Sequence, residues 1–81
     1  MAKSLVNRYD VVIRCTYYTK YNQVRPIYHG HFEYDVTEEF IGGESSAVDH
    51  FAGKYNKTLS GRYAETVYQV VGVYRVIMEV N

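Results

Sequence analysis

Alternation of apolar and polar residues restricts the fold of this chain more than any other feature. From Tyr9 to Tyr18, one set of alternate positions carries Tyr, Val, Ile, Cys and Tyr, and the other set includes Asp, Arg and Thr. Residues 27–36 alternate in the same way, and residues 66–80 are rich in β-branched and aromatic side chains. These patterns are typical of strands with one buried face. The sequence therefore predicts three strands, and residues 37–41 either prolong the second strand or form a loop.

Residues 45–56 have the spacing of an amphipathic helix instead. Their apolar side chains recur at i, i+3, i+4 and i+7, which places them on one helical face. These side chains are Val48, Phe51, Ala52 and Tyr55. Ser46 followed by Asp49 resembles a capping box, and the Gly42-Gly43 pair separates this helix from the second strand. Residues 56–61 are expected to form a loop after the helix.

These elements predict an α+β fold in one domain that spans residues 1–81. The first two strands form a hairpin, and the helix returns the chain to a third strand. A right-handed crossover places this third strand beside the first, which gives a small antiparallel sheet of strand order 2-1-3. One helix then packs on one face of the sheet. Gly72 is expected to mark a bulge or bend in the third strand.

Composition and motifs exclude several classes of function. The formal net charge is zero, so the chain is not a nucleic-acid polycation or an acidic DNA mimic as a whole. The single Cys15 forms no intramolecular disulfide, which favours a cytoplasmic location, the host cytoplasm if the protein is viral. No apolar run reaches about 18 residues, so we expect no membrane contact. Phosphate-loop, dinucleotide and zinc-protease motifs do not occur, and we expect neither enzymatic activity nor a cofactor.

The charges fall in blocks, and two regions stand out as contacts for a partner. Residues 8–25 and 54–62 each carry a net charge of +3, whereas residues 33–49 carry −6. The first region is the hairpin with its aromatic and basic side chains, and the second is the acidic segment with its apolar tip. The predicted partner-binding residues are Tyr18, Lys20, Tyr21, Arg25, Glu38, Glu39, Phe40, Ile41 and Glu44.

The ten tyrosines divide between the expected core and the surface. Seven of them fall on the predicted core faces, where the ring packs and the hydroxyl reaches the rim. These are Tyr9, Tyr17, Tyr28, Tyr34, Tyr55, Tyr68 and Tyr74. Tyr18, Tyr21 and Tyr63 remain as candidates for recognition.

The sheet face without a helix is expected to carry a row of apolar side chains from the third strand. The row consists of Val67, Val71, Val73 and Ile77. An uncovered apolar row is closed by a partner or by a second copy of the chain. The sequence therefore predicts a homodimer interface at these four residues.

A histidine pair offers a metal-binding alternative. His29, His31 and Glu33 occupy alternate positions on one strand face, and imidazole and carboxylate groups can bind zinc. A solvated polar face explains the same pattern, and we expect no metal. Cys15 is expected to lie in the core without a partner base, as a small apolar side chain rather than a nucleophile.

One short cysteine-poor domain, with a small antiparallel sheet, one helix and no catalytic motif, resembles many phage-encoded inhibitors of host machinery, anti-CRISPR proteins among them. The resemblance covers the whole chain, is one of architecture, and implies binding and blocking. We therefore expect a non-catalytic module that blocks or modulates a protein or a protein–nucleic-acid complex, such as a host defence or nucleic-acid-processing system. Two alternatives remain open: a nucleic-acid-binding domain that uses the Tyr/Arg/Lys hairpin, and a homodimeric ligand-binding or metal-dependent protein.

Overall fold

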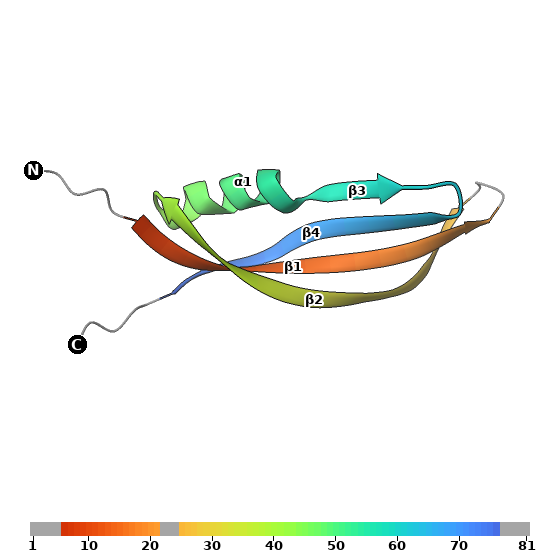
Figure 1. Cartoon of the computed structure of the whole chain (residues 1–81), viewed down its shortest axis with the longest axis horizontal. Coiled ribbons are helices and arrows are strands. Elements are labelled where there is room, and N and C mark those ends of the chain that lie inside the picture. Colours follow the sequence, from red (N-terminus) through yellow and green to blue (C-terminus); the bar gives the residue numbers. More distant parts are fainter. Residues whose placement is uncertain (1–5, 22–24, 77–81) are drawn as a thin grey trace, which may run out of the picture.

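The fold is a four-stranded antiparallel sheet with one helix. The computed structural model describes residues 6–21 and 25–76, without the side chain of Tyr21. Its elements are β1 (Val6–Tyr21), β2 (Arg25–Ile41), α1 (Glu44–Tyr55), β3 (Lys57–Ser60) and β4 (Ala64–Arg75). The strands lie in the order β2-β1-β4-β3, so the two central strands are β1 and β4 (Figure 1). The α1 helix spans 12 residues, too few for a membrane-crossing helix, and the described residues contain none.

The α+β class and the relative order of the three long strands agree with the sequence prediction. The short strand β3, which pairs with β4, replaces part of the loop expected after the helix. Residues 37–41 prolong the second strand, since β2 ends at Ile41. The third predicted strand ends at Arg75 as β4, and its expected continuation over residues 77–80 lies outside the described residues.

The predicted capping box at Ser46 and Asp49 is wrong. The helix begins earlier, at Glu44, with Gly43 as its N-cap and without a side-chain hydrogen bond to the cap. The Gly43 carbonyl accepts the first helical hydrogen bond, from the Ala47 amide. Glu44 in the first turn and Lys54 in the last turn complement the helix dipole instead.

The core is small and lies under α1. Tyr9, Val11 and Ile13 of β1 are completely buried, together with Ala47 and Phe51 of α1. Side chains from β2 and β4 surround this cluster. They include Val36, Phe40, Tyr68, Val70 and Val73. The odd-numbered face of β1 is therefore the face that the helix covers.

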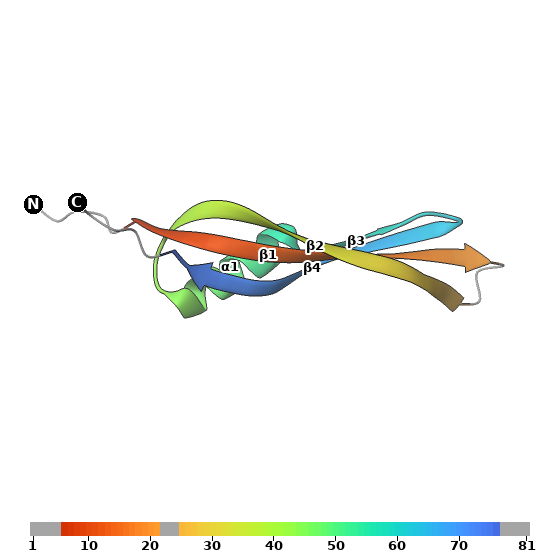
Figure 2. The ribbon, with the colours of Figure 1, turned by 90° about the horizontal axis from the view of Figure 1, so that it is seen from below.

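The molecule is long and thin, and the helix covers only part of its length. Its extents are 61 × 23 × 15 Å, and its radius of gyration is 16.8 Å, against about 12 Å for a compact chain of this length. Figure 1 shows α1 over one half of the sheet, followed by β3 along the same long side. Figure 2 shows β1, β2 and β4 as long twisted ribbons that extend well past the helix. Half of the helix-bearing face is thus left open.

Two bulges change which side chains face the helix. In β4, Gly72 pairs with Val12 and Val70 pairs with Ile13, so Val71 is an extra residue. An extra residue reverses the alternation beyond it. The bend expected at Gly72 is therefore present. However, Val73 packs against the core, and Tyr74, predicted on the core face, is 60% exposed on the other side.

The described residues of the predicted homodimer row do not lie on one sheet face. Val67 lies on the sheet face opposite the helix, across from Thr16, whereas Val73 belongs to the helix-bearing face. Val71 is exposed at the bulge, and Ile77 lies outside the described residues. The helix-free face therefore does not present the apolar stripe that the alternation suggested.

The second bulge lies in β2. Gly30 pairs with Tyr17 and Tyr28 pairs with Tyr18, so His29 is the extra residue. The bulge moves Tyr28 to the face opposite the helix, where its ring meets Tyr18 edge-on with centroids 6.2 Å apart. Tyr28 was predicted on the core face and is 55% exposed.

Candidate binding surface

Four aromatic rings line the open half of the helix-bearing face. Tyr17 comes from β1, Phe32 and Tyr34 from β2, and Tyr68 from β4. Their register places them around Cys15, which pairs with Phe32 on one side and with Tyr68 on the other. Phe32 lies centrally, with ring centroids 6.2 Å from Tyr17 and 6.0 Å from Tyr34. We call these four side chains the aromatic strip.

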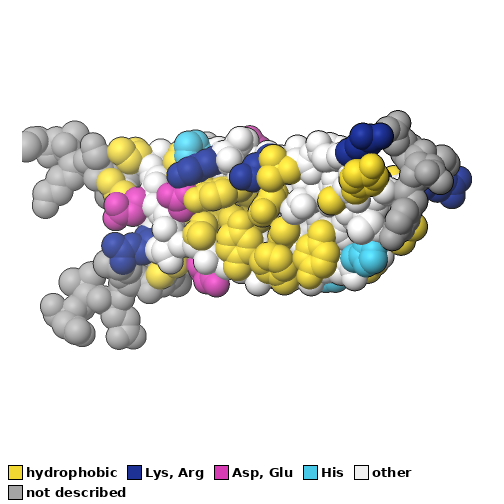
Figure 3. All heavy atoms as spheres, turned by 45° about the vertical axis from the view of Figure 1, so that its right-hand side comes forward, with side chains coloured by type: hydrophobic (Ala, Val, Ile, Leu, Met, Phe, Trp, Pro, Cys, Tyr) yellow, Lys and Arg dark blue, Asp and Glu magenta, His cyan; other side chains and the backbone are white. Residues whose placement is uncertain are grey.

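The rings of the aromatic strip shield the strand beneath them but remain open to solvent. Cys15 is only 3% exposed, whereas Phe32 is 50%, Tyr17 41% and Tyr34 37% exposed. The Tyr17 ring lies over Gly30, where a Cβ would be in ordinary van der Waals contact with its Cε2 at 3.5 Å. Figure 3 shows apolar side chains gathered in one large patch over the middle of a face. A contiguous aromatic patch of this kind marks a contact surface more often than scattered apolar residues do.

One basic side chain lies at the edge of the aromatic strip. The Lys57 ammonium lies 4.8 Å from the centre of the Tyr68 ring, a cation–π contact. The nearby Cys15 raises the pKa of the Tyr68 hydroxyl above its ordinary value. The strip therefore offers flat rings, three of which carry a hydroxyl group, and a cation at its edge.

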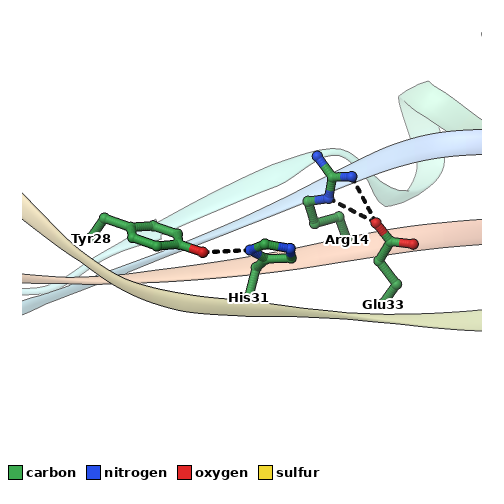
Figure 4. Close-up of polar contacts among 4 residues, drawn as sticks. All are labelled: Arg14, Tyr28, His31 and Glu33. Atoms are coloured by element: carbon green, nitrogen blue, oxygen red, sulfur yellow. Dashed lines mark hydrogen bonds and ion pairs between the residues drawn. The ribbon is translucent and has the colours of Figure 1, made fainter.

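The opposite sheet face carries most of the carboxylates of β2. Arg14 donates to the Glu33 carboxylate at 2.7 and 2.9 Å, as Figure 4 shows. Asp35 pairs with Val12 in the register, and its side-chain hydrogen bond raises the pKa of Asp10. The neutral chain thus has one charged face and one largely aromatic face.

The hairpin contacts predicted from the sequence lie at one end of the molecule. Lys20 hydrogen-bonds Ser60 at 2.5 Å and forms an ion pair with Glu65 at 3.4 Å. Arg25 is exposed. A hollow of about 240 Å³ is lined there by Lys20, Arg25, Pro26, Gly61 and Arg62. Tyr18 packs on Tyr28 and faces away from the helix, and the Tyr21 side chain lies outside the described residues.

The acidic segment lies at the opposite end, because β1 pairs with β2 from Val6–Ile41 to Tyr21–Arg25. Ile41 is exposed and Glu39 forms an ion pair with Arg8 at 3.5 Å. Phe40 is half-buried, with its ring stacked on His50. A hollow of about 650 Å³ is lined by Val6, Asn7, Arg8, Glu39, Glu44, Val73, Tyr74, Arg75 and Val76. The two predicted contact regions therefore do not form one surface.

The histidines do not converge on a metal site. His29 Nε2 lies 2.6 Å from the Thr19 hydroxyl, whereas His31 Nδ1 lies 2.6 Å from the Tyr28 hydroxyl. The bulge at His29 separates the two rings onto different faces of the sheet, and Figure 4 shows His31 beside Tyr28 and apart from the Arg14–Glu33 pair. Among residues 6–21 and 25–76, no three His, Cys, Asp or Glu side chains are grouped as ligands for a metal ion.

Glu38 joins β2 to the helix. Lys54 donates to its carboxylate at 2.6 Å, and the Tyr55 hydroxyl donates to the same oxygen. These two hydrogen bonds, that of Lys54 above all, hold the pKa of Glu38 below its usual range. Its negative charge is thus already compensated within the chain.

The Glu38 contacts predict a pH-dependent contribution to folding. Since the pKa of Glu38 is lower in the folded chain, its stabilisation is present above the unfolded pKa and disappears as the pH falls through the folded pKa. Urea unfolding between about pH 7 and pH 3 should show less loss of stability with acid for Glu38→Gln than for the wild-type chain. Glu39→Gln, at an exposed ion pair, serves as control. Equal pH slopes for Glu38→Gln and the wild type would contradict the assignment.

The aromatic strip was missed because the sequence pattern placed its members in the core. The available signal was length: 12 helical residues cover about 18 Å, whereas the 16 residues of β1 extend about 50 Å. The helix therefore has to leave a large part of any shared face open. No protein-family model, curated protein or solved structure matches this chain, so the aromatic strip is characterised by its geometry alone.

Proposed function

We propose that this protein is a non-catalytic binding module that docks on a macromolecular partner through the aromatic strip, and that it blocks or modulates that partner. The observation that carries the proposal is the group of exposed rings of Tyr17, Phe32 and Tyr34, continued by the partly buried Tyr68, on three adjacent strands. Aromatic side chains supply large contact areas with little loss of conformational entropy, and they are enriched in protein-binding hot spots. Binding and blocking is also what the resemblance to small phage-encoded inhibitors implies.

A protein surface is the better supported partner because many charges are already matched inside the chain. Four bases form ion pairs with carboxylates: Arg8 with Glu39, Arg14 with Glu33, Lys20 with Glu65, and Lys54 with Glu38. Nucleic-acid binding draws its affinity from several bases that meet phosphates. The aromatic strip has Lys57 at its edge and otherwise offers apolar rings.

An unpaired nucleic acid is the second candidate, and one contact favours it. Lys57 lies against the Tyr68 ring, so a base stacked on the strip would have a cation near its phosphate. This candidate requires a steep loss of affinity for single-stranded oligonucleotides between about 50 and 200 mM salt. Binding that does not change over this range would exclude it.

The aromatic strip is tested by capture from a lysate of the natural host. Phe32→Ser combined with Tyr34→Ser should reduce recovery of the specific partner about tenfold or more, because central aromatic contacts are each worth about 2 kcal/mol. Recovery is measured by quantitative mass spectrometry against the wild-type chain. The double variant keeps the Leu59 side chain, which is exposed on the neighbouring strand β3.

The control variant is Tyr63→Ser, which removes an exposed aromatic ring away from the strip. It should retain the partner at the wild-type level. Circular dichroism must show that all variants are folded. Equal recovery with the strip variant and the wild-type chain would refute docking through this surface, and recovery of the bait alone at low salt would refute the binding function.

A further inference from the structure

The outer edge of β2 is long and poorly protected. Within the described residues, β2 has a neighbouring strand on its β1 side alone. It spans 17 residues and contains no lysine, and its one proline, Pro26, stands near its start. Natural sheets usually protect an edge with short strands, charged side chains (lysine above all), proline or bulges, because free edge amides and carbonyls recruit other strands. The charges of β2 repel a strand of like charge but not one of complementary charge. Here one bulge, at His29, leaves residues 30–41 as a regular edge.

This edge strand also carries large exposed apolar side chains. Ile27, Tyr28, Phe32, Tyr34 and Ile41 are all exposed to a third or more of their surface. A long edge with such side chains is an aggregation hazard unless it is paired with another strand. The pattern therefore indicates that β2 has a strand partner.

The charges along β2 are ordered from basic to acidic. Its first half carries Arg25, His29 and His31, and its second half carries four acids: Glu33, Asp35, Glu38 and Glu39. A strand with this order is complementary to itself when a second copy runs antiparallel. Basic residues of one copy then lie beside acidic residues of the other, in both halves at once.

We propose that the chain forms a homodimer in which the β2 strands of two copies pair antiparallel about a two-fold axis at Phe32. In this register His31 lies opposite Glu33 of the second copy, and Gly30 lies opposite Tyr34. A two-fold axis at Glu33 would place Glu33 opposite its own copy, and an axis at His31 would place His31 opposite its own copy. The axis at Phe32 avoids both like pairs and puts an aromatic residue at the centre.

Because of the bulge, residues that pair across the two copies lie on the same face of the sheet. Because His29 is an extra residue, Tyr28 comes to lie opposite Asp35 of the second copy, and Ile27 opposite its Val36. Ile27 and Val36 both belong to the helix-bearing face, and Tyr28 and Asp35 both belong to the other face. Apolar side chains thus meet apolar ones, and a phenol meets a carboxylate.

Pairing about this axis builds one eight-stranded sheet with both helices on the same face. A two-fold axis perpendicular to the sheet places the two helices at opposite ends. The two aromatic strips then form one continuous surface between the helices, with the two Phe32 rings at its centre. The dimer does not depend on the proposed function, since it uses the edge of β2, whereas the partner is proposed to use the face.

Disulfide trapping tests the axis directly. A residue on the axis lies about 4.5–5.5 Å from its own copy, within the Cα range that a disulfide spans. Both cysteine variants are made in a Cys15→Ser background, because Cys15 pairs with residue 32 of its own chain and would compete for the disulfide. Phe32→Cys should then give a covalent dimer on mild oxidation. Tyr34→Cys is the matched control, because Tyr34 and its copy would lie about 14 Å apart. The wild-type chain, whose Cys15 is buried, should remain uncrosslinked.

A charge exchange provides a second test that leaves the aromatic strip intact. In a dimer of the His31→Glu variant, the new glutamate lies opposite Glu33 of the other copy. In a dimer of the Glu33→Lys variant, the new lysine lies opposite His31 of the other copy. Each unfavourable contact occurs twice in a dimer. Each variant alone should dimerise about tenfold more weakly than the wild-type chain in sedimentation equilibrium. An equimolar mixture should recover dimer, because the introduced glutamate of one copy faces the introduced lysine of the other across one pairing. The native His31 and Glu33 face each other across the second.

Three outcomes would overturn the proposal. The first is a wild-type chain that sediments as a monomer at about 100 µM. The second is a Tyr34→Cys variant that crosslinks as fast as Phe32→Cys. The third is a mixture of the two charge variants that associates as weakly as each variant alone. Circular dichroism spectra that match the wild-type chain ensure that none of these results reflects unfolding. A monomeric wild-type chain whose strip variant loses the partner would refute the dimer and support the function, whereas a wild-type dimer whose strip variant keeps the partner would refute the function and leave the dimer.

Discussion

Replacement of Phe51 by alanine is expected to remove a large part of the stability of this chain. Phe51 is completely buried between α1 and the sheet, and its ring meets Tyr9 and Phe40 edge-on with centroids 6.0 and 5.8 Å away. Truncation of a buried phenylalanine costs about 3–5 kcal/mol. A chain of 81 residues has a total free energy of unfolding of about 4–12 kcal/mol. Urea unfolding should show a midpoint shifted far toward zero denaturant.

The matched control lies in the same helix. Val48→Ala removes a side chain that is 45% exposed, and alanine favours the helix. Its free energy of unfolding should stay within about 0.5 kcal/mol of the wild-type value. Both measurements are made at one protein concentration, since association would add to apparent stability. A Phe51→Ala variant as stable as Val48→Ala would show that the helix does not form the core.

This sensitivity follows from how little of the chain is buried. The described core has five completely buried residues, and α1 supplies two of them. The sequence was sufficient to predict the β1 face of this core, because Tyr9, Val11 and Ile13 alternate without interruption. It was also sufficient to place a helix near residues 45–56 and the third long strand beside the first. Strong periodicity over ten or more residues carries this information.

The parts that escaped prediction depend on single residues. An extra residue at Val71 moves Val73 into the core and Tyr74 out of it, and nothing in the alternation locates the extra residue beyond the nearby Gly72. The bulge at His29 acts in the same way on Tyr28. One inserted residue reverses every assignment that follows it. In β4 the misassigned residues follow the bulge, whereas in β2 the misassigned Tyr28 precedes it, so an alternation pattern assigns the faces correctly on one side of a bulge alone.

The aromatic strip escaped prediction for a different reason. Its residues do lie on the face that the sequence assigned to the core, as the alternation around Cys15 indicated. The local pattern does not show how much of the sheet the helix covers. The α1 helix spans 12 residues, whereas β1 spans 16 residues with about twice the rise per residue. The same residues change from core to candidate binding surface because the helix ends before the sheet does.

Replacement of Gly42 by alanine is expected to destabilise the turn between β2 and α1 by about 2–3 kcal/mol. Gly42 has a φ of +149°, a conformation that glycine adopts and other residues rarely do. A Cβ there would lie 2.7 Å from Cε2 of Phe40, whose ring packs against the core. Its carbonyl accepts hydrogen bonds of 2.9 Å from Asn7 and from the Tyr9 hydroxyl. A shift of this peptide therefore disturbs the buried Tyr9 as well.

The adjacent glycine distinguishes backbone strain from a general loss of glycine. Gly43 has a φ of −84°, and no atom lies within 4 Å of the position that its Cβ would take. Alanine is a poorer N-cap than glycine, but it also restricts the unfolded chain, and the two effects nearly cancel. Gly43→Ala should stay within about 0.5 kcal/mol of the wild-type chain in urea unfolding. If both variants lost the same stability, the strain and the Phe40 contact at Gly42 would not be the cause, because Gly43 has neither.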